Sequence, residues 1–245
     1  MSNKTKYGKC RLCGIESYLS FEHIPPKSAF NNHPVFIQLF DHLVNQESEH
    51  FGRRMKSNRG YGAYTLCQPC NNNTGGWYAK NFSEFAQQGM EIIGNHTKGT
   101  RFIEGTYIIK PLNVLKQVLV MFMSADKADV LLSDKELRNF LLNTDYQILP
   151  NRWKIFLYSN LSNRYRMMGY CVSTDNKLKI QRWAEINFKP FGYLLADNSD
   201  PAQENMLDIT NFCNYQYNEQ VKISLRTPYL EINSSPFIGT YYVPR

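Results

Sequence analysis

Four cysteines in two CxxC pairs constrain this 245-residue chain more than any other feature of its sequence. Cys10 and Cys13 form the first pair, and Cys67 and Cys70 form the second. Each CxxC turn holds two thiolates on the same side of the backbone, so two such turns supply the four ligands of a tetrahedral zinc ion. The spacing therefore predicts one structural Zn²⁺ bound by Cys10, Cys13, Cys67 and Cys70.

Other roles for the cysteines fit the sequence less well. A redox-active CxxC is expected in a strand–helix pattern of the thioredoxin type, which neither pair shows. Cys171 and Cys213 stand alone in strand-like or apolar contexts, as buried thiols do. The segment Met1–Cys10 is polar and lacks the apolar stretch of a signal peptide, and no apolar run is long enough for a membrane span. We expect a soluble, cytoplasmic protein with no membrane partner.

The charge balance favours a polyanionic partner. Basic residues outnumber acidic ones by 28 to 21, which gives a formal net charge of +7. Basic side chains that meet phosphates release condensed counterions, which drives association with nucleic acid. A solvated basic surface with no such partner is the alternative. The 16 tyrosines and 15 phenylalanines could stack on bases, although most are expected in the core.

A second motif lies between the two cysteine pairs. Glu22 and His23 end a predicted strand and are followed by Ile-Pro-Pro, while Asn71 comes directly after the second CxxC. This arrangement resembles the HNH endonucleases, whose pattern is a CxxC, an Asp-His followed by Ile-x-Pro, and a second CxxC followed by Asn or His. The resemblance covers about the first 95 residues and does not extend to the rest of the chain.

The resemblance implies a treble-clef ββα-metal module that is stapled by the structural zinc and hydrolyses phosphodiester bonds. It assigns three catalytic residues: His23 as the general base, with Glu22 and Asn71 holding a divalent ion, Mg²⁺ or another. A neutral imidazole can take a proton from water at physiological pH, and hard divalent ions prefer oxygen ligands. Asn72 and Asn73 are close enough to compete with Asn71 for this role. The implied function is that of a metal-dependent DNA endonuclease, and a role in restriction or antiphage defence follows by analogy alone.

The chain departs from the family pattern at several positions. Glu22 replaces the usual Asp. Gly62 stands where a structural Asn is common, with Asn58 as a candidate substitute, and Thr74 replaces a Lys or His. These departures favour an alternative, a non-catalytic zinc treble-clef module that binds nucleic acid or protein.

Basic residues cluster near the motifs. The residues expected to contact phosphates are Lys27, Arg53, Arg54, Lys56 and Arg59. The alternative is a solvated loop, with Glu47 and Glu49 as acidic counterparts.

The remaining sequence predicts an α+β fold with a boundary near residue 98. We expect residues 1–98 to form the nuclease module and residues 99–245 to form an α+β domain for target selection, sensing or support. Helical patterns cover 35–44, 74–93, 111–124 and a segment capped at Ser133-Asp134, and strand-like patterns dominate after residue 153. Basic surface candidates in the second part are Arg152, Arg164, Arg166, Lys177, Lys179 and Arg182. DNA is the expected partner; RNA as a substrate and a homodimer remain open.

Overall fold

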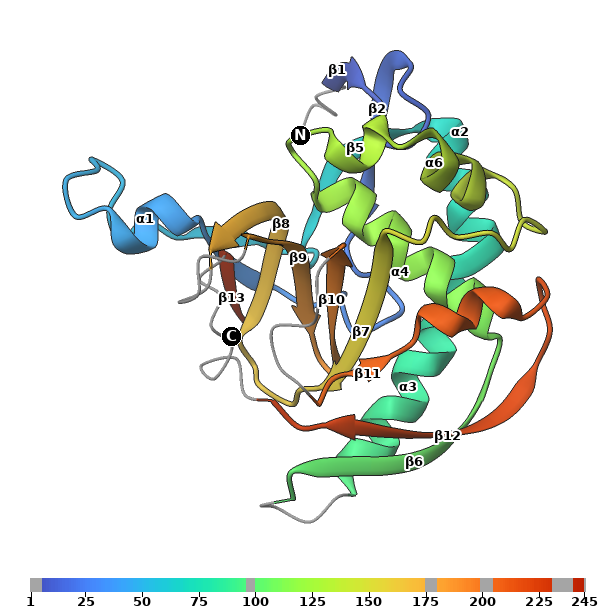
Figure 1. Ribbon diagram of the computed structural model, residues 1–245. Helices are drawn as coiled ribbons and strands as arrows, with labels where there is room; N and C mark the ends of the chain where they lie inside the picture. The colour runs from blue at the N-terminus through green and yellow to red at the C-terminus, as the bar shows by residue number, and fades with distance from the viewer. Residues whose placement is uncertain (1–5, 96–99, 175–179, 199–204, 231–239, 245) are drawn as a thin grey trace.

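The computed structural model describes residues 6–95, 100–174, 180–198, 205–230 and 240–244, which form a mixed α+β fold (Figure 1). The strands are β1 (Lys6–Lys9), β2 (Glu16–His23), β3 (Val35–Gln38), β4 (Met55–Ser57), β5 (Gly62–Cys67), β6 (Phe102–Ile109), β7 (Trp153–Ser159), β8 (Tyr165–Thr174), β9 (Ile180–Phe188), β10 (Phe191–Asp197), β11 (Leu207–Asp208), β12 (Val221–Pro228) and β13 (Thr240–Pro244). The helices are α1 (Phe40–Val44), α2 (Gln68–Thr74), α3 (Lys80–Gly94), α4 (Pro111–Ala125), α5 (Val130–Ser133) and α6 (Lys135–Leu142), with a π-helical turn η1 (Gly75–Ala79) and a 3₁₀ turn η2 (Thr210–Asn214).

The N-terminal part contains a small antiparallel sheet of order β1-β2-β5. The first CxxC forms the turn between β1 and β2, where the Gly14 amide donates to the Cys10 carbonyl at 2.9 Å. Gly14 has a φ of +81°, which a residue with a side chain rarely adopts. Cys67 ends β5, and Cys70 lies in the first turn of α2. The two cysteine pairs therefore meet at one end of this sheet.

The large sheet has eight strands in the order β11-β7-β10-β9-β8-β13-β3-β4 and joins distant parts of the chain. β3 pairs antiparallel with β13, although the two strands lie near opposite ends of the sequence. The helix predicted over 35–44 is therefore wrong in its first half: only Phe40–Val44 is helical, and Val35–Gln38 is a strand. The apolar spacing fits both structures, and pairing with β13 and β4 decides in favour of the strand.

α4 crosses the molecule between the small and large sheets (Figure 1). All fifteen of its residues are buried, as expected of a helix with apolar residues on every side. The main apolar core contains residues from both sides of position 98, including Phe85, Tyr107, Leu119 and Phe191. Residues 1–98 and 99–245 therefore share one core and the large sheet. That each part folds independently stays a prediction.

Several predicted elements in the second part are confirmed. The strand-like patterns after residue 153 correspond to β7–β10, β12 and β13, and β9 and β10 form a hairpin. The N-cap of α6 is Asp134 rather than Ser133, because its carboxylate accepts from the amide of Leu137 at 3.0 Å. Among the described helices, none has both the length and the apolar character that a membrane crossing requires.

Candidate functional site

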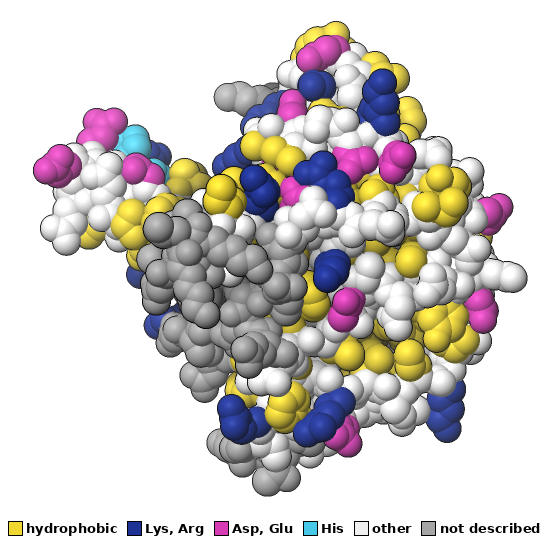
Figure 2. Space-filling model, viewed as in Figure 1, with side chains coloured by type: hydrophobic (Ala, Val, Ile, Leu, Met, Phe, Trp, Pro, Cys, Tyr) yellow, Lys and Arg dark blue, Asp and Glu magenta, His cyan; other side chains and the backbone are white. Residues whose placement is uncertain are grey.

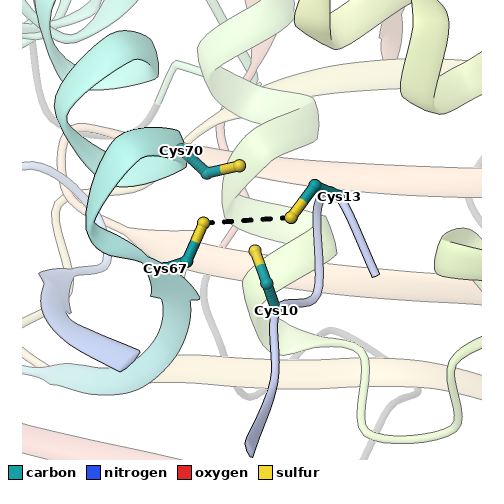
Figure 3. Close-up of side chains that lie close together, drawn as sticks. All are labelled: Cys10, Cys13, Cys67 and Cys70. Atoms are coloured by element: carbon teal, nitrogen blue, oxygen red, sulfur yellow. Dashed lines mark hydrogen bonds between the residues drawn. The ribbon is translucent and has the colours of Figure 1, made fainter. Parts of the chain in front are cut away.

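The four cysteines of the two CxxC pairs converge on one point (Figure 3). Their sulfur atoms all lie within 4.8 Å of one another, and Cys13 Sγ is 3.8 Å from Cys67 Sγ. Sulfurs bound to one tetrahedral zinc at about 2.3 Å are about 3.8 Å apart, whereas a disulfide needs about 2.05 Å. The geometry therefore fits a cation and not a disulfide, and these residues could hold one Zn²⁺.

The electrostatics of the cluster also favour a cation. The hydrogen bond between Cys70 and Cys10 lowers the pKa of Cys10 to about 4, and the same contact raises the pKa of Cys70. One thiolate in the cluster thus discourages ionisation of its neighbour, because like charges at this separation repel. A divalent ion removes that repulsion and allows all four thiols to ionise.

His23 ends β2 with its ring half-buried against the ring of Phe21, 5.0 Å away between centroids. Its Nε2 lies 3.0 Å from the backbone carbonyl of Arg59. A carbonyl can only accept, so neutral His23 carries its proton on Nε2 and keeps a lone pair on Nδ1. Burial, opposed by this hydrogen bond and assisted by the charges of Lys27 and Arg59, lowers the pKa of His23. The ring is therefore held as a neutral base near pH 7.

Glu22 is buried on the side of β2 that faces α4. Its Oε2 accepts from Thr65 at 3.1 Å and from the hydroxyl of Ser124. Within the described residues Oε1 accepts no hydrogen bond, although it is not fully enclosed. Burial raises the pKa of Glu22 to about 7 against the opposing effect of these hydrogen bonds. Such a carboxyl is stabilised in its charged form by a cation nearby.

Asn71 lies in the first turn of α2 and is fixed against β2. Its side-chain amide donates to Ser20 Oγ at 2.9 Å and to the Phe21 carbonyl at 3.2 Å. These bonds leave the amide oxygen without a hydrogen bond from any described residue. Asn72 and Asn73 are both exposed and do not line the cavity described next, so the structure favours Asn71 over both.

One cavity of about 180 Å³ brings the predicted catalytic residues together. Its walls include His23, Glu22 and Asn71, together with Lys27 and, from α4, Gln117. The π-helical turn η1 also lines it, and such turns often occur at functional sites. Sequence reasoning missed Gln117, because nothing local indicates that the buried helix α4 faces this cavity.

The departures from the family pattern have structural reasons. A Cβ at Gly62 would lie 2.2 Å from the Glu22 carbonyl oxygen, so asparagine does not fit at this position. No described contact joins the Asn58 side chain to His23; the backbone carbonyl of Arg59 orients the ring instead. The hydroxyl of Thr74 donates to the carbonyl of Cys70 at 2.9 Å, which satisfies it inside the helix.

Asn31, a second residue that the sequence did not reveal, supports the loop after His23. It is fully buried, and its amide nitrogen donates to the carbonyls of Pro25 and Tyr61, both at 2.7 Å. Its oxygen accepts from the Tyr61 amide at 2.7 Å. Asn31 thus joins the Ile-Pro-Pro segment to Tyr61, directly before the strand β5 that ends at Cys67.

The predicted phosphate contacts fall into two groups. Lys27 and Arg59 lie close enough to His23 to lower its pKa by their charge. The other three, Arg53, Arg54 and Lys56, are exposed in β4 and in the loop before it. Figure 2 shows acidic and histidine side chains on the lobe that α1 and this loop form. None of the five basic residues forms a salt bridge with a described residue, and Glu49 pairs instead with His50 at 3.3 Å.

Of the six basic residues predicted on the surface of the second part, two form ion pairs, two are exposed and two are not described. Arg166 is 1 % exposed and pairs with Glu185 at 2.6 Å, so its prediction as a surface group is wrong. Arg152 pairs with Asp197 at 2.8 Å. Lys177 and Lys179 lie outside the described residues, whereas Arg164 and Arg182 are exposed.

Comparison with known proteins does not assign the chain to a family. No family model matches the chain, and no curated protein or solved structure is significantly similar to it.

Proposed function

We propose that the chain is a metal-dependent endonuclease of the HNH type that hydrolyses phosphodiester bonds in DNA. The observation that carries the proposal is the His23 ring, which a backbone carbonyl orients and which lines the same cavity as Glu22 and Asn71. No described residue forms a hydrogen bond with its Nδ1. The proposal treats β1, β2, β5, α2 and the four-cysteine cluster as a treble-clef ββα-metal module with structural zinc.

Each residue has a distinct role in the proposed reaction. His23 accepts a proton from the attacking water at Nδ1, while the Arg59 carbonyl holds the opposite side of the ring. Oxygens of Glu22 and Asn71 would hold a divalent ion such as Mg²⁺. When bound, that ion would polarise the scissile phosphate and stabilise charge on the leaving oxygen. Glu22 Oε1 and the amide oxygen of Asn71, which accept no hydrogen bond from a described residue, fit this role.

The rate of cleavage should depend on the protonation of His23. The pKa of this histidine is lowered from its ordinary value of about 6.5. Its neutral form therefore predominates at pH 6.5 and above. A saturating divalent ion keeps Glu22 charged, so we expect kcat/KM to rise with pH through the lowered pKa of His23 and to level off near neutrality. A pH–rate profile on plasmid DNA checks this. A profile that keeps rising well above pH 8 would assign the base to another group.

Lys27 and Arg59 should contribute to DNA affinity by contacting phosphates beside the cut. Replacing both with alanine leaves the Arg59 backbone carbonyl in place. We expect weaker binding and a shallower dependence of log K on log salt, by about 0.9 for each phosphate that is no longer neutralised. The slope is obtained by measuring DNA affinity at several salt concentrations, either without the divalent ion or with DNA that is already nicked. Lys222→Ala, an exposed change on β12, is the matched control and should leave the slope unchanged.

One observation favours the alternative, a zinc module that binds nucleic acid or protein without cutting. Glu22 already has two hydrogen-bond donors on Oε2, so its carboxyl is partly satisfied without an ion. A cleavage assay separates the two functions. Mg²⁺-dependent conversion of supercoiled plasmid supports the enzyme, whereas tight DNA binding without conversion supports the module. Parallel RNA substrates test the preference for DNA, and a sizing experiment tests for a homodimer. A role in restriction or antiphage defence remains part of the proposal by analogy.

A further inference from the structure

Gln117 lines this cavity and has a buried side-chain oxygen that no described residue satisfies. It lies in α4, is 3 % exposed, and lines the cavity with Glu22, His23 and Asn71. Its Oε1 has no hydrogen-bond partner among the described residues. A buried amide oxygen without a partner is unfavourable, and such groups in folded proteins call for a ligand, water or ion.

The other buried polar side chains of α4 do have hydrogen-bond partners. Asn113 donates to the Trp77 carbonyl at 3.0 Å, and Lys116 donates to three backbone carbonyls. Ser124 donates to Glu22. Gln117 differs from these residues because it lines the cavity while its enclosed Oε1 has no partner among the described residues. A half-turn of the terminal amide exchanges the positions of Oε1 and Nε2 and so changes which of the two atoms lies nearer the cavity.

An amide oxygen can accept a hydrogen bond or bind a cation. It cannot pair with a phosphate oxygen, because both groups are acceptors. Amide and carboxylate oxygens are suitable ligands for hard divalent ions. The residues that line the cavity already include Glu22, which has a carboxylate, and Asn71, which has an amide oxygen.

We propose that Gln117 supplies a third protein oxygen to the divalent ion of the proposed nuclease site. This inference rests on the proposed function for the location of the ion. It makes the site a joint product of the zinc-stapled part and of α4, which comes after residue 98. Hydrogen bonds from Arg11 to the Ser124 carbonyl and from Arg138 to the Cys13 carbonyl join the two parts.

Mn²⁺ titration of the full-length, zinc-loaded protein, followed by the EPR signal of free Mn²⁺, tests the proposal without requiring cleavage. Gln117→Leu keeps the size of the side chain but removes the oxygen. We expect it to weaken Mn²⁺ binding by about 10–100-fold, the range seen when groups around a metal are removed. Gln117→Glu should tighten binding, because a carboxylate adds charge. Gln87→Leu, the same change at an exposed position of α3, should leave affinity unchanged.

The outcomes separate this proposal from the proposed function. Wild-type protein that binds Mn²⁺ but does not cut DNA would overturn the nuclease, while a weaker Gln117→Leu would still support the ligand. Cleavage by wild type together with unchanged Mn²⁺ affinity in folded Gln117→Leu would overturn the ligand alone. If Gln117→Leu fails to fold, Gln117→Glu decides, since unchanged Mn²⁺ affinity there contradicts the proposal. Wild type that binds no Mn²⁺ overturns both.

Discussion

Replacing His23 with alanine is expected to lower the rate of DNA cleavage by about 10²–10⁴-fold, the usual contribution of a general base. The ring lies half-buried at the end of β2 and contributes one hydrogen bond, to the Arg59 carbonyl. Its removal should therefore change catalysis far more than stability. Steady-state cleavage of plasmid DNA gives the rate, while thermal unfolding and zinc content show that the protein remains intact.

His33→Ala is the matched control for this experiment. His33 is also partly buried and has a lowered pKa, chiefly through burial, but it does not line the cavity. We expect it to cut DNA at the wild-type rate. Wild-type cleavage by His23→Ala, with His33→Ala equally active, would place the catalytic base elsewhere and remove the central support for the nuclease.

Replacing Cys67 with serine is expected to abolish zinc binding and unfold the part of the chain around β1, β2 and β5. Zinc bound to four thiolates contributes on the order of 10–16 kcal/mol to the folding of such modules. Cys10, Cys67 and Cys70 also belong to the main apolar core, so loss of the ion would disturb packing around them. Elemental analysis should give one zinc per wild-type chain, and thermal unfolding should show a large decrease in Tm for the variant.

Cys213→Ser is the control for the removal of a thiol outside the cluster. Cys213 is partly buried, and its Sγ lies 3.7 Å from the Asn214 side-chain oxygen. We expect this variant to keep its zinc and most of its stability. Purified wild-type protein without zinc, or a Cys67→Ser variant with an unchanged Tm, would refute the structural zinc site.

Local sequence patterns carried much of the information about the secondary structure and the cysteine cluster. A CxxC is a turn with two thiols on one side, so the two knuckles could be paired without knowing the fold. The alternation of apolar residues after Trp153 and the proline that begins α4 likewise express local preferences of the backbone. These features were predictable because each depends on residues close together in the chain.

The cavity could be predicted only in part. Glu22, His23 and Asn71 were assigned through the resemblance to the HNH endonucleases, and the structure places all three around one cavity. Gln117 and Asn31 were missed, because a buried amide looks like any polar residue until its neighbours are known. The environment of His23 was equally hidden, since its partner is a backbone carbonyl, which every residue possesses.

The sequence by itself determined the two cysteine knuckles, the Glu-His motif beside them and the elements with strong local patterns. Only the tertiary structure decided that β3 joins β13, that Arg166 is buried against Glu185, and that Gln117 of α4 lines the cavity. The reason is physical: local turns and periodicities depend on neighbouring residues, whereas strand pairing and burial depend on contacts between distant segments. Those contacts form together, so they are specified by the whole chain and not by any one motif.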